Sequence, residues 1–121
     1  MPESTPRVRE ILERVRKSAT KDPEEIMLII MEVLKEYASY PEVGKFYTFV
    51  YYPKTPGIEY DQHPLIACTS VEKWGFRGIN FHWRKPRQYT WEEVAGKIYT
   101  VRYNELDELL SLRYGKFKIN K

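Results

Sequence analysis

The chain has 121 residues, a formal net charge of +3, 42% hydrophobic residues and 31% charged residues. This balance is typical of a single folded, soluble domain and excludes extended disorder. A charge so close to neutrality also excludes a chain built mainly to coat nucleic acid, although local binding of an anionic partner stays open. We therefore expect one domain over residues 1–121, with a helical N-terminal part at 1–40 and a β-rich body at 41–121.

The cysteine count and the first residues bear on the compartment. The single cysteine, Cys68, cannot form an internal disulfide, and it lies in an apolar run where a buried thiol behaves as a small hydrophobic group. The chain opens without a basic segment followed by an apolar one, and its longest apolar stretch is far shorter than the ~20 residues that span a bilayer. These features favour the cytosol, or assembly there into something larger, and no contact with a membrane.

Two helices are predicted at the N-terminal end. The first begins at Thr5 and Pro6, which suit the cap and the first helical position, and its apolar residues recur at helical spacing. The second begins at Asp22, whose side chain can accept backbone N–H groups, and continues to Tyr37. The apolar residues of the first helix are Val8, Ile11, Leu12, Val15 and Ala19.

The second predicted helix is apolar on almost every side, because only Glu32 is polar between Ile26 and Leu34. A helix of this kind is buried on more than one side. Either the first helix and a sheet cover opposite sides of it, or another protein covers one side. In the second case the interface residues are Ile26, Met27, Ile30, Met31 and Leu34.

Beyond residue 41 the sequence changes to short β-rich runs separated by turns. Strands are predicted at 45–52, 65–71, 76–83, 98–101 and 116–119, with a short turn at 91–95 and a third helix at 104–113. The connection at 73–75 is tight, so the second and third of these strands should form an antiparallel hairpin. Lys85 and Pro86 should end the third strand, because proline has no N–H to donate to a ladder.

These elements predict an α+β fold. Two N-terminal helices precede a small, strongly bent antiparallel sheet of about four or five strands, and a short helix follows near the C-terminus. A sheet of this kind can close into an SH3-like barrel, an option that the sequence leaves open. A parallel sheet is disfavoured, because the turns between consecutive strands are too short for crossover helices.

The residue inventory disfavours metal binding and catalysis. The chain has two histidines, His63 and His82, and no short-spaced pair of ligands that would organise a zinc ion. Cys68 lies among apolar neighbours, which raise the pKa of a thiol and make it a poor nucleophile. No glycine-rich phosphate-binding loop occurs in the sequence. We therefore expect no enzyme activity, no cofactor and no small-molecule substrate.

One group of polar residues is expected to be structural. Strand alternation places Asn80 and His82 on the same face, and the corner at Tyr60 and Asp61 can approach them. The Asp61 carboxylate would then set the tautomer of His82. We interpret Tyr60, Asp61, Asn80 and His82 as a network that holds a loop to the sheet, in preference to a catalytic group.

Residues 73–91 form a basic and aromatic segment that contains no acidic residue. Its cations can bind phosphates while its aromatic rings stack on bases, which would suit DNA. Tryptophan and arginine also dominate protein interfaces, and the near-neutral total charge favours a protein partner. The residues expected to contact DNA are Arg77, Arg84, Lys85 and Arg87, and those expected to contact a protein are Trp74, Trp83 and Trp91.

Several short motifs lie between residues 45 and 87. They are Phe46-Tyr47-Thr48-Phe49, then Tyr60-Asp61 with Pro64-Leu65-Ile66, then Gly75-Phe76-Arg77-Gly78-Ile79-Asn80-Phe81-His82-Trp83. This order resembles a family of small virion-associated proteins of tailed bacteriophages, which share a Tyr-Asp…Pro-Leu corner and a Gly-Phe-x-Gly-x-Asn-x-His-aromatic strand. Some members look like proteins that protect DNA ends during head filling. The resemblance implies a place in the virion, after assembly in the host cytoplasm.

The resemblance and the residues together lead to three functional expectations. The first is a non-enzymatic structural protein that docks on neighbouring virion proteins, or on its own copies, at the neck, tail or head vertex. The second is an accessory protein that binds phage DNA or its ends. The third and most remote is a ribonuclease toxin with an SH3-like barrel, which depends on fold analogy alone.

Overall fold

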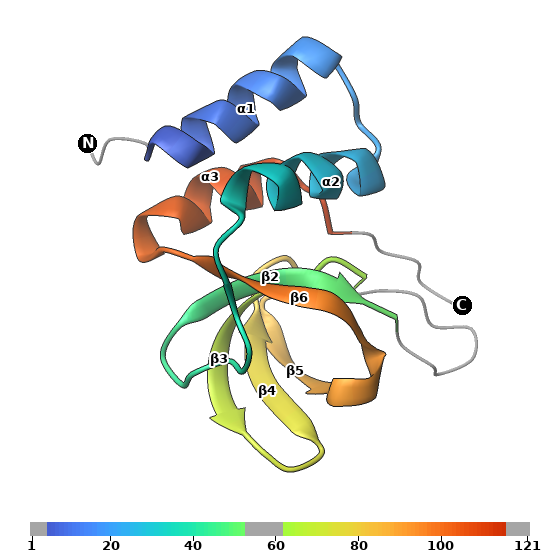
Figure 1. The fold of residues 1–121 in the computed structure, drawn as a ribbon, viewed down its shortest axis with the longest axis vertical. Coiled ribbons are helices and arrows are strands. Elements are labelled where there is room, and N and C mark those ends of the chain that lie inside the picture. Colours follow the sequence, from blue (N-terminus) through green and yellow to red (C-terminus); the bar gives the residue numbers. More distant parts are fainter. Residues whose placement is uncertain (1–4, 53–61, 116–121) are drawn as a thin grey trace.

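The structure, a computed structural model, describes residues 5–52 and 62–115 and has the expected α+β class (Figure 1). Its helices are α1 (Pro6–Ser18), α2 (Pro23–Leu34) and α3 (Leu106–Ser111), with 3₁₀ helices η1 (Trp91–Glu93) and η2 (Tyr103–Glu105). Its strands are β1 (Tyr37–Ala38), β2 (Phe46–Tyr51), β3 (Leu65–Val71), β4 (Gly75–Asn80), β5 (Lys85–Thr90) and β6 (Val94–Val101). The predicted order of two helices, a run of strands and a short final helix is confirmed.

All of these strands join one antiparallel sheet in the order β1-β6-β2-β3-β4-β5. Figure 1 shows the sheet strongly curved, with the three helices gathered on one side of it. Across the described part of the chain the sheet stays open, because β1 and β5 are its two edges. The predicted bend is therefore present, whereas closure into an SH3-like barrel is not.

Strand β2 separates two apolar cores, because successive side chains point to opposite faces of a sheet. Tyr47, Phe49 and Tyr51 belong to the core inside the curve, together with side chains from β3, β4, β5 and β6. Phe46 and Val50 instead pack against the core beneath the helices, which also contains residues of β3 and β6. The helices therefore cover the outer face of the sheet near β2, β3 and β6, and these contacts do not extend to β4 and β5.

The N-terminal ends of α1 and α2 form as predicted. The Thr5 hydroxyl accepts a hydrogen bond from the Val8 N–H, and the Asp22 carboxylate accepts one from the Glu24 N–H. The predicted end of α2 is wrong, because Lys35 takes a left-handed conformation with φ 55° and stops the helix there. The residues that follow, 37–38, form β1 and pair with β6.

The middle of the chain departs from prediction in two strands. The third predicted strand ends at Asn80, and residues 81–84 form a turn. The chain then continues as β5, which the presence of Pro86 argued against. Pro86 is tolerated because β5 is an edge strand that pairs only with β4, so one side of it needs no N–H donors. Strand β6 begins at Val94, earlier than predicted, and the strand predicted at 116–119 lies outside the described residues.

Most apolar side chains of α2 are buried or half-buried against other elements of the same chain. Its inward side chains pack against α1, the sheet and α3 in one core. They are exposed by 3% at most, so they are not available to a partner in this conformation. The prediction that α2 contacts a partner is therefore corrected for four of its residues, which are core residues instead: Ile26, Met27, Ile30 and Leu34. Met31 is half-buried, and the neighbouring Leu28 is 56% exposed.

Candidate functional site

The outer face of β4 and β5 is the part of the sheet that the helical core leaves uncovered. Antiparallel register places Arg77 opposite Gln88 and Ile79 opposite Pro86, so these four side chains share the outer face. All four are exposed, and Ile79 keeps 37% of its surface open. We call Arg77, Ile79, Pro86 and Gln88, with the flanking Trp74, the β4–β5 face.

An open depression of about 550 Å³ lies on this face, lined by Arg77, Pro86, Arg87 and Gln88. The Arg77 guanidinium lies 5.5 Å from the ring centroid of Trp74, and Trp74 is 40% exposed. At the other end of β4 the Lys85 ammonium lies 5.6 Å from the ring centroid of Trp83. Each cation thus stacks on an indole, which holds its charge near an aromatic ring.

Four cations of this region form no ion pair within the described residues. Lys73, Arg77, Arg84 and Lys85 form no ion pair with any residue at 5–52 or 62–115. All four are exposed. An anionic partner could therefore bind these cations without breaking an existing ion pair.

The three tryptophans predicted to form one contact surface lie in two places. Trp74 and Trp91 share one end of β4, where the Trp91 N–H donates to the Trp74 carbonyl at 3.3 Å. Trp91 is half-buried, packs 5.3 Å from the ring of Phe76 and donates its indole N–H to the Lys73 carbonyl. Trp83 is in the turn beyond the other end of β4. Of the three tryptophans only Trp74 is exposed, and the other two are half-buried.

Asn80, one of the four residues of the predicted polar network, is buried and hydrogen-bonded between β4, β5 and the turn that joins them. Its amide Nδ2 donates to the Tyr89 hydroxyl at 3.2 Å, and its Oδ1 accepts from the Trp83 N–H at 3.0 Å. These bonds tie β4 to β5 and shape the turn between them. The predicted partners Tyr60 and Asp61 lie outside the described residues.

His82 does not share a strand face with Asn80, because β4 ends before it. Its ring packs edge-on against Tyr114, with centroids 5.0 Å apart and planes at 90°. Burial, together with a smaller contribution from the nearby His63, lowers the pKa of His82 to about 4. His82 is therefore a neutral packing residue at physiological pH.

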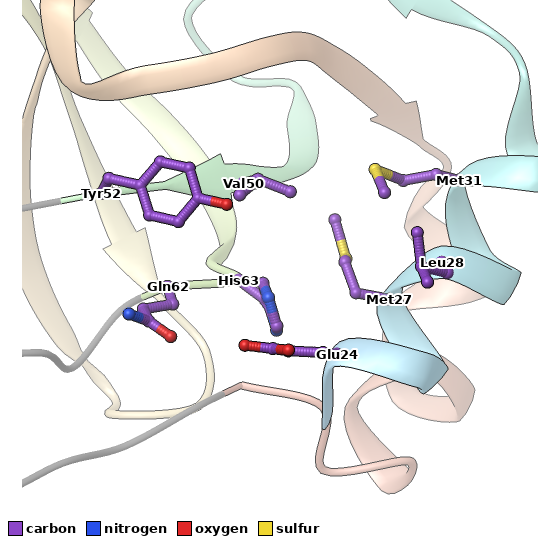
Figure 2. Close-up of a pocket in the computed structure, with 8 residues that line it drawn as sticks. All are labelled: Glu24, Met27, Leu28, Met31, Val50, Tyr52, Gln62 and His63. Atoms are coloured by element: carbon purple, nitrogen blue, oxygen red, sulfur yellow. The ribbon is translucent and has the colours of Figure 1, made fainter. Parts of the chain in front are cut away.

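A second hollow lies between α2 and the sheet (Figure 2). We call it the α2 groove. It has a volume of about 230 Å³ and is formed by side chains from α2, from the end of β2 and from the segment before β3. Its lining residues are Glu24, Met27, Leu28, Met31, Val50, Tyr52, Gln62 and His63. Sequence reasoning named Met27 and Met31, but it could not assemble residues from three distant segments.

Tyr114 is linked to the α2 groove through His63. It is fully buried, its hydroxyl lies 2.8 Å from the Thr48 hydroxyl, and its carbonyl oxygen lies 2.9 Å from His63 Nδ1. Burial raises the pKa of Tyr114 far above its usual value, an effect that the Thr48 hydrogen bond partly offsets. The phenol therefore stays protonated and serves as a hydrogen-bonded core residue.

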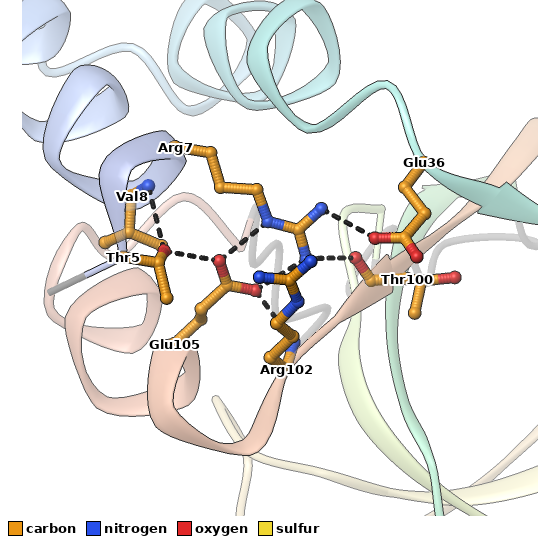
Figure 3. A network of polar contacts seen from close by, with 7 residues as sticks. All are labelled: Thr5, Arg7, Val8, Glu36, Thr100, Arg102 and Glu105. Carbon is orange, nitrogen blue, oxygen red and sulfur yellow. Dashed lines mark hydrogen bonds and ion pairs between the residues drawn. The ribbon is translucent and has the colours of Figure 1, made fainter.

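A buried carboxylate, Glu105, joins the helices to the end of the sheet (Figure 3). It receives hydrogen bonds from the Arg7 guanidinium, the Thr5 hydroxyl and the Arg102 N–H. Arg7 also pairs with Glu36 at 2.9 Å. Because every oxygen of Glu105 has donors inside the protein, the cluster is a structural latch between α1 and η2.

The described residues present no group of three close histidine, cysteine or carboxylate side chains that could hold a metal ion. Burial raises the pKa of the Cys68 thiol, and the Ser70 carbonyl partly offsets this by accepting its hydrogen bond. No helix in the described part of the chain is long and apolar enough to cross a membrane.

Comparison with known proteins returns no match to any family model, any curated protein or any solved structure. Two surfaces are therefore the candidates for function. They are the β4–β5 face, which is basic and partly apolar, and the α2 groove, which is apolar and carries a carboxylate.

Proposed function

We propose that the chain is a non-enzymatic structural protein of a bacteriophage particle, which docks on neighbouring virion proteins through the β4–β5 face. The motif that resembles the phage family, residues 75–83, comprises β4 and most of the turn after it, and thus contributes Arg77 and Ile79 to this face. The observation that carries the proposal is that this outer face lacks helical cover and combines an exposed isoleucine with an indole-stacked arginine.

The composition of the face suits a protein partner. Arginine and tryptophan are the residues most often responsible for binding energy at interfaces, and an apolar centre with a polar rim is their usual setting. Here Ile79 and Pro86 form the apolar centre, with Arg77 and Gln88 beside them. Arg77 is preorganised by its stacking on Trp74, so less side-chain entropy is lost when it binds.

The docking proposal is tested with purified phage particles. The pure chain should co-sediment with particles that lack their own copy of it, and Ile79→Ser combined with Arg77→Ala should reduce the bound fraction at least about tenfold, since each such contact contributes roughly 1 kcal/mol or more. Val43→Ser is the matched control, because Val43 is an exposed aliphatic residue at 64% in a different loop. Light scattering of the free chain tests self-association. A monomer that binds no particle protein would contradict the proposal.

A second candidate function is binding of phage DNA, and one observation favours it: four exposed cations at 73–85 lack ion pairs within the described chain. Unneutralised cations bind phosphates by releasing counterions, so the affinity falls steeply as salt rises. Arg84→Ala with Lys85→Ala should reduce the slope of log K against log salt by about 2, with one unit lost for each phosphate contact.

The two candidates are separated by matched variants. Arg9→Ala with Arg16→Ala removes the same charge from the exposed side of α1 and should leave DNA affinity nearly unchanged if the contacts are local. Ile79→Ser should weaken docking on particle proteins and spare DNA binding, because it removes no charge. Fluorescence anisotropy with labelled single-stranded and double-stranded DNA provides the measurement. Equal loss with both double charge variants would show nonspecific attraction only.

A further inference from the structure

The β4–β5 face carries its charged and apolar side chains in a fixed order, and this order indicates the chemistry of a partner. We propose that the face binds an extended acidic segment in which a carboxylate and a large apolar side chain lie two positions apart. This inference rests on the docking proposed above, and it adds the kind of segment that a neighbouring protein must present.

The outer side chains of the sheet lie in two rows across the strands. One row is polar, because Arg77 lies opposite Gln88. The next row is apolar, because Ile79 lies between Pro86 of β5 and Ala67 of β3. Side chains two positions apart on one face of a strand are separated by ~7 Å, so the two rows are about that far apart. The same spacing separates alternate side chains of an extended partner segment.

The polar row is suited to a carboxylate. Arg77 forms no ion pair with any described residue, and its guanidinium lies over the Trp74 ring, 5.5 Å from the centroid. A guanidinium can bind both oxygens of a carboxylate at once. No aspartate or glutamate lines the depression, and the Gln88 amide can supply a further donor. An acidic side chain would therefore meet a complementary charge on this row.

The apolar row favours a protein segment over nucleic acid. Ile79 is 37% exposed and Pro86 is exposed, so an apolar side chain laid across them removes surface from water. A phosphate backbone offers no side chain of that kind. Bases bind by stacking on exposed aromatic rings, but one face of the Trp74 ring already carries Arg77. A peptide with both a carboxylate and an apolar side chain matches both rows.

Four capped pentapeptides test the charge, the apolar side chain and the spacing. The first, acetyl-Glu-Ser-Leu-Ser-Glu-amide, has a carboxylate two positions from leucine on either side, so it fits in either direction. The others change one feature each: acetyl-Lys-Ser-Leu-Ser-Lys-amide reverses the charge, acetyl-Glu-Ser-Ser-Ser-Glu-amide removes the leucine, and acetyl-Ser-Glu-Leu-Glu-Ser-amide moves the carboxylates next to it. Because neighbouring side chains of an extended segment point to opposite faces, the last peptide cannot place both groups on the β4–β5 face.

Binding is followed by NMR of the ¹⁵N-labelled chain, with the backbone N–H signals of Arg77, Ile79 and Gln88 as reporters. The ionic strength is about 0.15 M, where charges more than ~8 Å apart are largely screened. We expect the first peptide to shift all of these signals with saturation. The other peptides should bind at least about fivefold more weakly, because each lacks one of the contacts or their spacing.

Two matched pairs of variants locate the contacts. Arg77→Gln should weaken binding of the first peptide at least about fivefold, whereas Arg16→Gln, which removes the same charge from the exposed side of α1, should leave it unchanged. Ile79→Ser should weaken binding by a similar factor, with Val43→Ser as the control at an exposed aliphatic residue outside the face. All of these positions are exposed, so the core stays intact, and the amide spectrum of each free variant checks this.

Three results would overturn the proposal. The first is that the first peptide shifts none of the reporter signals. The second is equal binding of any of the other peptides; for the leucine-free peptide this would show attraction of any anion, as expected of a face that binds DNA. The third is a shift of the same signals with rising concentration of the chain alone, which would mean that a second copy occupies the face.

The peptide test and the particle test can fail separately. If particles bind the chain through the β4–β5 face but the first peptide does not, the docking proposal stands and the acidic segment is wrong. If the first peptide binds with the expected preferences but particles do not, the site for an acidic segment stands and the docking proposal is wrong.

Discussion

Arg7 and Glu105, which are 98 positions apart in the chain, form a bidentate, largely buried ion pair. Arg7 Nε lies 2.7 Å from Glu105 Oε2, and Arg7 Nη2 lies 2.7 Å from Glu105 Oε1 (Figure 3). The Glu105 side chain is fully buried, while Arg7 is 14% exposed. The pair therefore fastens the first turn of α1 to the segment that follows β6.

Arg7→Ala should destabilise the fold by about 3 kcal/mol, because it leaves a buried carboxylate without its main partner. Arg14→Ala is the control, since Arg14 pairs with Glu10 and Glu32 at the half-exposed surface, where removal should cost less than about 1 kcal/mol. Urea unfolding of both variants measures the difference. Equal costs would show that the Arg7–Glu105 pair contributes no more than a surface pair.

Glu105 should also make stability depend on pH in the acid range. Burial alone would raise the pKa of Glu105, but hydrogen bonds from Arg7, Thr5 and the Arg102 N–H, with the Arg7 charge, lower it below 4.5. The stabilisation is therefore present above the unfolded pKa and is lost as the pH falls through the lower folded pKa.

Glu105→Gln should accordingly be less stable than the parent chain near neutral pH and lose less stability on acidification below about pH 4.5. Unfolding midpoints in urea across that range provide the measurement. If the stability of the two proteins changed with pH in parallel, Glu105 would not have a lowered pKa in the folded state.

His82 should contribute a second, separate pH dependence. Its pKa falls from 6.5 to about 4 on folding, mainly through burial and secondarily through His63. The unfolded chain then binds a proton that the folded chain does not, so stability falls as the pH drops from about 6.5 towards 4, by about 3 kcal/mol in total.

Proton NMR of the imidazole signals checks this value directly, with His82→Gln identifying the signal that disappears. A titration midpoint of the His82 ring near 6.5 would show that the ring is solvated and not packed on Tyr114.

Gly75 is required by close backbone approach. A Cβ atom there would lie 1.9 Å from the carbonyl oxygen of Tyr89 on β5. Gly75→Ala should therefore push β4 and β5 apart and cost at least about 2 kcal/mol. Gly96→Ala is the matched control, because a Cβ at Gly96 has no atom within 4 Å and the cost should be about 1 kcal/mol, from its φ of +80° alone. Thermal unfolding of the two variants measures the difference. If Gly96→Ala cost more stability than Gly75→Ala, the close approach of β5 to Gly75 would be refuted.

Local chemistry was sufficient for much of the fold. Thr5 and Asp22 cap their helices, and residues 65–71 form a strand as their β-branched and apolar content indicates. These features depend on neighbours in the chain, which sequence spacing displays directly. The α+β class follows from the order of such elements.

Other features needed the arrangement in space. Pro86 argued against a strand until the sheet order placed it on an edge, and Lys35 ended α2 before its apolar pattern did. The sequence showed that α2 is apolar all round, but only the packing of α1, α3 and the sheet decided that most of it is core.

The order and spacing of the residues were enough to predict a small α+β domain with capped helices and a bent antiparallel sheet. The tertiary structure alone decided which surfaces stay open, how Arg7 reaches Glu105, and that Glu24, Tyr52 and His63 meet around one hollow. The physical reason is that propensity and capping act between neighbours in the chain, whereas burial and ion pairing depend on distances that folding sets between segments far apart in it.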